Sequence, residues 1–95
     1  MAELTHFFGL VICVFYNDHG TPHVFVRRGR SKPWIAAANI AIADGALING
    51  DLASADLRRV RRWLAAHRAA AQAAWDFARV GIRPGRIAPT IRGCR

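Results

Sequence analysis

Residues 7–16 narrow the possible folds more than any other stretch, because they are apolar on both sides of any strand that they form. Aromatic and β-branched residues dominate this stretch, which favours an extended conformation. One alternating set is Phe8, Leu10, Ile12, Val14 and Tyr16, and the other is Phe7, Val11, Cys13 and Phe15. A strand of this kind belongs in the middle of a sheet or at a contact between subunits.

Turn-forming residues follow this strand. Residues 17–22 contain Asn, Asp, Gly and Pro, whose side chains and restricted φ angles favour a turn. Residues 23–28 then read as a second strand that ends in two arginines. The two strands together predict an antiparallel pair.

The next residues predict two further strands. Pro33 suits the first position of a strand, and residues 34–42 continue it. Asp44 and Gly45 predict a two-residue type I′ hairpin, because both central residues of that turn need positive φ. A short fourth strand, residues 46–49, would complete an antiparallel meander.

One long helix is predicted over residues 54–79. Ser54 is a good N-cap, Asp56 complements the helix dipole, and Gly81 can close the end in the left-handed conformation. At about 100° per residue, one face collects Val60, Trp63, Leu64, His67, Ala71, Ala74, Trp75 and Ala78. This face must pack on the sheet. We therefore predict an α+β fold, a small antiparallel sheet of three to four strands packed against one long C-terminal helix.

The length of 95 residues suits a single domain. We assign residues 1–80 to that α+β domain and residues 81–95 to a basic C-terminal tail, extended or disordered. Ten apolar residues in the first strand are too few to span a bilayer as a helix, so no contact with a membrane is expected. The two cysteines show no paired spacing, which predicts a reducing, cytoplasmic setting.

The net charge of +8 favours acidic partners, including nucleic acid. The candidate phosphate-binding residues are Arg27, Arg28, Arg30, Arg58, Arg61, Arg62 and Arg68. No helix-turn-helix, RNP aromatic motif or zinc finger accompanies them. A solvated helix face, produced by a bias toward arginine codons, is the competing interpretation.

The predicted turn holds the first candidates for chemistry. Asp18, His19 and His23 could offer one carboxylate and two imidazoles to a divalent metal or a polar ligand. The competing interpretation is a turn held by hydrogen bonds from Asp18, with the histidines packed at the sheet edge. Our prediction includes no bound metal and no cofactor.

His67 is the second candidate, near the centre of the helix's apolar face. One interpretation is a core histidine that is hydrogen-bonded to a backbone carbonyl. The other brings His67 toward His19 or His23, with Asp18 as the orienting group, for general acid–base work. No serine or threonine shows a motif that ties it to a base, so an enzymatic role is uncertain and a non-enzymatic one is favoured.

Several of these residues also carry a resemblance to a known family. They are Phe7-Phe8-Gly9-Leu10-Val11-Ile12, Asn17-Asp18-His19, Pro22-His23, Asp44-Gly45, Gly50, Trp63, His67, Trp75, Ile87 and Pro89. In this pattern the chain resembles a small bacterial family, domain of unknown function 4160. Relatives commonly carry a second histidine two residues after the position of His23, where this chain has Phe25. The departure weakens a metal or histidine-pair mechanism.

The resemblance also implies a function. Genes of that family often stand beside those of domain of unknown function 2442, in a toxin–antitoxin-like arrangement. Our first hypothesis is therefore an interaction component of a two-gene module, whose partner is a small protein encoded nearby. A second copy of the chain is another candidate partner. A basic nucleic-acid-binding module and a small hydrolase-like enzyme that uses the turn histidines are the alternatives.

Overall fold

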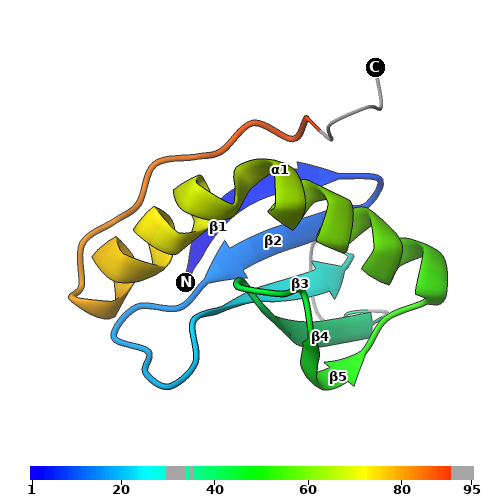
Figure 1. Ribbon diagram of the computed structural model, residues 1–95, viewed down its shortest axis with the longest axis horizontal. Helices are drawn as coiled ribbons and strands as arrows, with labels where there is room; N and C mark the ends of the chain where they lie inside the picture. The colour runs from blue at the N-terminus through cyan, green and yellow to red at the C-terminus, as the bar shows by residue number, and fades with distance from the viewer. Residues whose placement is uncertain (30–33, 35, 91–95) are drawn as a thin grey trace.

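The computed structural model describes residues 1–29, 34 and 36–90, which form an antiparallel sheet followed by a helix (Figure 1). The elements are β1 (Ala2–Phe7), β2 (Leu10–Val14), β3 (His23–Arg28), β4 (Ala36–Ala41), β5 (Leu47–Asp51) and α1 (Ser54–Arg79). The strands pair in chain order, and α1 lies across one face of the sheet. The predicted α+β class and meander are confirmed, with five strands instead of three to four.

The additional strand arises because the chain reverses at Phe8 and Gly9. Both residues have positive φ, 50° and 75°, and Phe7 pairs with Leu10 across the turn. This is the two-residue hairpin geometry that follows the twist of the flanking strands. A continuous strand over residues 7–16 therefore does not form. Its second half, β2, lies between β1 and β3 with every residue buried, as the two-sided apolar pattern predicts.

The loop between β4 and β5 differs from the predicted type I′ turn. Of the central pair, only Gly45 has positive φ. A four-residue loop forms instead, closed by bonds from Gly45 N to Ala41 O (2.9 Å) and from Ala41 N to Ala46 O (2.9 Å). The longer loop lets Ile42, which would have been the last residue of the strand, enter the core with no exposed surface.

Helix α1 begins and ends at the predicted residues, but its start is made differently. Ala53 occupies the N-cap position and no side chain caps it, so the capping role predicted for Ser54 is wrong. The carboxylate of Asp56, in the first turn, accepts hydrogen bonds from two arginines, Arg28 and Arg59.

The C-terminal end of α1 is closed as predicted. Gly81 has a φ of 82° and donates its N–H to Ala78 O (2.9 Å). Ile82 donates to Phe77 O (2.9 Å). These two bonds define a Schellman motif, which satisfies carbonyls that the helix leaves unpaired.

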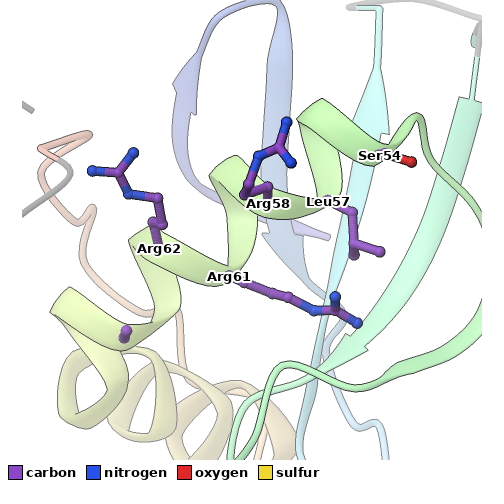
Figure 2. Close-up of a pocket in the computed structure, with 6 residues that line it drawn as sticks. Ser54, Leu57, Arg58, Arg61 and Arg62 are labelled. Atoms are coloured by element: carbon purple, nitrogen blue, oxygen red, sulfur yellow. The ribbon is translucent and has the colours of Figure 1, made fainter.

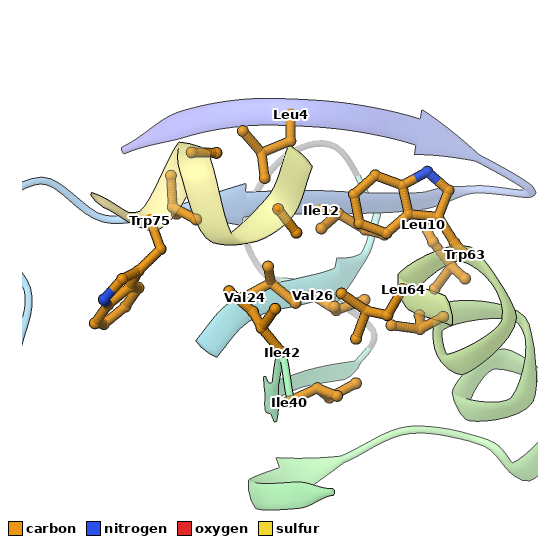
Figure 3. Close-up of a cluster of buried hydrophobic side chains, with 14 of the residues drawn as sticks. Leu4, Leu10, Ile12, Val24, Val26, Ile40, Ile42, Trp63, Leu64 and Trp75 are labelled. Atoms are coloured by element: carbon orange, nitrogen blue, oxygen red, sulfur yellow. The ribbon is translucent and has the colours of Figure 1, made fainter. Parts of the chain in front are cut away.

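The main hydrophobic core lies between the sheet and α1 (Figure 3). Its largest fully buried side chains include Trp63, Trp75, Leu4, Leu10, Ile12, Ile40, Ile42 and Leu64. All the residues predicted for the apolar face of the helix are buried except His67. No helix in the described residues combines the length and apolarity needed to cross a bilayer.

Residues 82–90 run back along α1 on the side of β1 without regular secondary structure (Figure 1). Ile87 N donates to Leu4 O (2.8 Å), and Trp63 Nε1 donates to Ala88 O (2.9 Å). This part of the tail is extended and bound to the body of the protein. The predicted domain boundary after residue 80 stays a prediction, and residues 91–95 lie outside the described part of the chain.

Candidate functional site

The predicted turn brings Asp18 and His23 together. His23 Nε2 lies 3.2 Å from Asp18 Oδ2, and His23 Nδ1 lies 2.8 Å from Thr21 O. The imidazole ring also packs against Trp75, with 4.9 Å between ring centroids. Both ring nitrogens thus lie within 3.2 Å of an oxygen of the turn, which fixes the orientation of the ring.

His19 does not join this pair through its side chain. Its backbone N–H donates to Asp18 Oδ1 (2.8 Å), and the residue is exposed. Within residues 1–29, 34 and 36–90, no three His, Cys, Asp or Glu side chains come together in a way that could hold a metal ion. Asp18 and His23 alone offer two ligands at most.

His67 lies at a kink in α1, where its φ and ψ are −127° and 27°. It is half-buried, its Nε2 lies 2.7 Å from Thr90 O, and its ring centroid lies 5.2 Å from that of Trp63. The predicted hydrogen bond to a backbone carbonyl forms, but the predicted place in the core is wrong. The kink turns the ring toward the tail.

The four candidate residues for acid–base chemistry do not converge. His23 packs on Trp75 and His67 packs on Trp63. Twelve residues of helix separate the two tryptophans, or about 18 Å at 1.5 Å per residue. The two histidines therefore belong to separate environments.

Three of the candidate arginines are bound within the protein. Arg61 Nε donates to Gly45 O (2.8 Å), and Arg68 Nε donates to Ile42 O (3.0 Å). Both bonds hold α1 to the loop before β5. Arg28 is bound to Asp56, and Arg30 lies outside the described residues. The guanidinium groups of Arg28, Arg61 and Arg68 therefore stabilise the fold.

Arg58 and Arg62 are exposed and make no hydrogen bond or ion pair with any described residue. With Arg61 they line a hollow of about 440 Å³ on the outer side of α1 (Figure 2). Arg58 and Arg62 point away from the sheet, whereas Arg61 reaches toward the loop before β5. The arginines thus do not form one continuous basic surface.

The carboxylate of Asp56 joins β3 to α1. Arg28 binds it with two bonds, from Nε to Oδ2 (2.7 Å) and from Nη2 to Oδ1 (2.6 Å), and Arg59 Nη1 adds a third (2.8 Å). The bonds from Arg28, and secondarily those from Arg59, lower the pKa of Asp56 although burial opposes the shift. Such bidentate, charge-assisted bonds are stronger than neutral ones.

Replacing Asp56 with asparagine should lower the free energy of unfolding by about 2 kcal/mol at pH 7, since both arginines lose their counter-charge while remaining partly solvated. The folded-state pKa of Asp56 lies below its unfolded value. The contribution is therefore present above that value and is lost as the pH falls below about 4. Urea unfolding between pH 3 and 7 should show a shallower acid limb in the variant. If the free energy of unfolding changed with pH in the same way for both proteins, protonation of Asp56 would not be linked to unfolding.

The face of the sheet opposite α1 carries a group of side chains that we call the aromatic face: Cys13, Phe15, Phe25, Arg27 and Trp34. Val24 and Val26 point into the core under α1, so Phe25 and Arg27 point to the other side. No helix or strand of the described chain covers this side.

The aromatic rings of this face form a row. Phe15 and Phe25 lie 5.3 Å apart between ring centroids, and Phe25 and Trp34 are also 5.3 Å apart. The guanidinium carbon of Arg27 lies 5.3 Å from the centroid of Trp34. The alternation of residues 7–16 places Phe15 and Cys13 on a second apolar side, but it does not connect them to Phe25 and Arg27. The alternation of side chains along β3 is the sequence signal that could have connected them.

Two results come from comparison with known proteins. Residues 9–76 match the family model described as "Domain of unknown function (DUF4160)". No curated protein and no solved structure matches the chain.

Proposed function

The chain belongs to the DUF4160 family, a domain of unknown function, and from this premise we propose that it is a protein-interaction component of a two-gene, toxin–antitoxin-like module in the cytoplasm. A small protein encoded nearby is the partner. It docks on the aromatic face of the sheet.

The observation that carries this proposal is the row of rings on a sheet face that no described element covers. Phe15 keeps 37% of its surface exposed, and Phe25 and Trp34 are half-buried beside it. Aromatic residues and arginine are enriched at the centres of protein interfaces, where they supply much of the binding energy. A two-layer domain normally leaves polar residues on its second sheet face, so this face is better suited to a partner than to water.

The two alternative functions have less support. A nucleic acid is bound by several cations along its backbone. Three of the candidate arginines make internal bonds instead, and the two exposed ones that have no partner among the described residues lie on α1. A hydrolase needs its acid–base groups within hydrogen-bonding reach, whereas His23 and His67 pack on different tryptophans.

Native mass spectrometry of the tagged chain, purified gently from its own host, tests the proposal. We expect a stoichiometric complex with one small protein for the wild type and its loss for Phe15→Ser. The matched control is Phe77→Ser, which removes an exposed ring from α1, where 50% of Phe77 is exposed. That variant should keep the partner. A wild-type chain without a partner, or equal loss in both variants, would contradict the proposal.

A further inference from the structure

We infer that Arg27 is the receptor for a carboxylate side chain that the protein partner presents to the aromatic face. The inference rests on the proposed function, because it names the chemistry by which that partner is recognised. It is carried by a buried cation that no Asp or Glu side chain of the described residues neutralises.

Arg27 is only 8% exposed, yet no Asp or Glu side chain in the described residues pairs with it. All six Asp and Glu residues lie in the described part of the chain. Asp56 is bound by Arg28 and Arg59, and Asp18 by His23. A buried charge without a partner is unfavourable, because it has lost its water without gaining a counter-charge.

Glu3 is the carboxylate closest to this group in the strand register, since it lies opposite Cys13. It is already bound by Arg86 Nη2 at 2.8 Å and by His6 Nδ1 at 3.1 Å. Although burial opposes the shift, these two bonds lower the pKa of Glu3. Its carboxylate is thus already bound by Arg86 and His6 and forms no ion pair with Arg27.

The contacts that Arg27 does make are weak. Its Nη1 lies 3.1 Å from Cys13 Sγ and 3.5 Å from Met1 Sδ, and sulfur is a poor acceptor. Burial raises the pKa of the Cys13 thiol in spite of the nearby guanidinium, so the sulfur brings no negative charge. Trp34 covers the flat side of the group through a cation–π contact. The Nε–H has no acceptor among the residues that the structure describes.

A carboxylate matches what is missing. It accepts two parallel bonds from the guanidinium fork and supplies the counter-charge in the same step. Met1 is 52% exposed, and its flexible thioether is the group that the incoming carboxylate displaces from Nη1. Phe15 and Phe25 then receive the apolar part of the residue or its neighbours.

A carboxylate of a protein fits this site better than the phosphates of a nucleic acid. Arg27 is a single cation among aromatic and sulfur-containing side chains. The unpaired Arg58 and Arg62 are on α1, which packs on the opposite face of the sheet from Arg27. A strand of phosphates needs a row of cations on one surface, whereas one acidic side chain flanked by apolar residues needs only this arrangement.

A titration of the full-length ¹⁵N-labelled chain tests the inference directly. The probe is the capped peptide acetyl-Leu-Glu-Leu-amide, and its matched control is the same peptide with Gln in place of Glu. We expect saturable shifts of the Arg27 Nε–H and the Trp34 indole N–H, with at least tenfold weaker binding of the Gln peptide. Equal binding of both peptides would overturn the inference. Stronger binding of a ten-residue oligothymidylate at the same resonances would assign the site to phosphate instead.

Two variants complete the test. Arg27→Met should lose the shifts and raise the melting temperature, because a buried charge is replaced by an apolar side chain of similar length. Arg62→Met, which removes an unpaired arginine from α1, should leave the titration unchanged. Arg27→Lys retains the charge without the fork and should bind the Glu peptide more weakly than the wild type, a comparison that remains if the Met variant does not fold.

The two proposals fail in different ways. A partner that co-purifies with the wild type and equally with Arg27→Met would leave the proposed function standing and overturn the role of Arg27. A wild-type chain without a partner would contradict the proposed function, while the peptide titration would still decide the chemistry of the Arg27 site.

Discussion

Replacing Trp63 with alanine is expected to lower the free energy of unfolding by about 3–5 kcal/mol, the range for truncating a buried aromatic side chain. The Trp63 side chain is completely buried between the sheet and α1, and its indole N–H donates to Ala88 O. The change thus opens a cavity and releases the tail in one step. Folded domains are stable by about 5–15 kcal/mol, so the variant should be close to unfolding at room temperature.

Chemical unfolding followed by circular dichroism provides the measurement, and Trp63→Phe is the matched control. Phenylalanine fills most of the space but cannot donate to Ala88, so it should lose much less stability than alanine. An alanine variant that is destabilised by less than about 1 kcal/mol, the size of an ordinary substitution, would contradict the role of Trp63 as the centre of the core.

Replacing Gly50 with alanine is expected to lower the free energy of unfolding by about 2–4 kcal/mol, because the added methyl group meets both an unfavourable backbone conformation and a steric clash. Gly50 has a φ of 84°, a conformation that residues with a Cβ rarely adopt. An added Cβ would also collide with Ala37 O and lie 2.7 Å from Ala38 Cα on the neighbouring strand β4. Backbone atoms cannot move aside as a flexible side chain can, so β5 would have to separate from β4.

Gly85→Ala is the matched control for this change. A Cβ at Gly85 meets no atom within 4 Å, and the residue has no positive φ. Its alanine variant should be as stable as the wild type or slightly more stable. If thermal unfolding gave the same melting temperature for both variants, this result would contradict the close approach of β5 to β4 at Gly50.

The extent of the helix was predictable because the signals that set it are local. The spacing of the apolar residues and the terminal glycine act within a few positions of one another. The first strand was not predictable by the same means. Its turn places Phe8 at positive φ, which a bulky side chain disfavours, so Gly9 by itself does not indicate a reversal within this apolar run. Pairing with β2 and burial of Leu4 outweigh that local preference.

The candidate site shows the same division between local and distant information. The contact of Asp18 with His23 spans five residues, and the turn residues indicate it. The kink at His67 and its bond to Thr90 depend on a tail segment 23 residues away. The aromatic face depends on knowing which side of the sheet α1 covers. Alternation assigns Phe25 and Arg27 to one side together but does not say which side remains open.

The position of the tail has a consequence for how the protein is made. Ile87 closes a hydrogen bond with Leu4, a residue 83 positions earlier, and Ala88 accepts the bond from Trp63. During synthesis, the first strand leaves the ribosome long before either contact can form. At about 5–20 residues per second, that side of β1 remains uncovered by the tail for several seconds. The side of β1 that the tail covers is therefore accessible to other proteins during that interval.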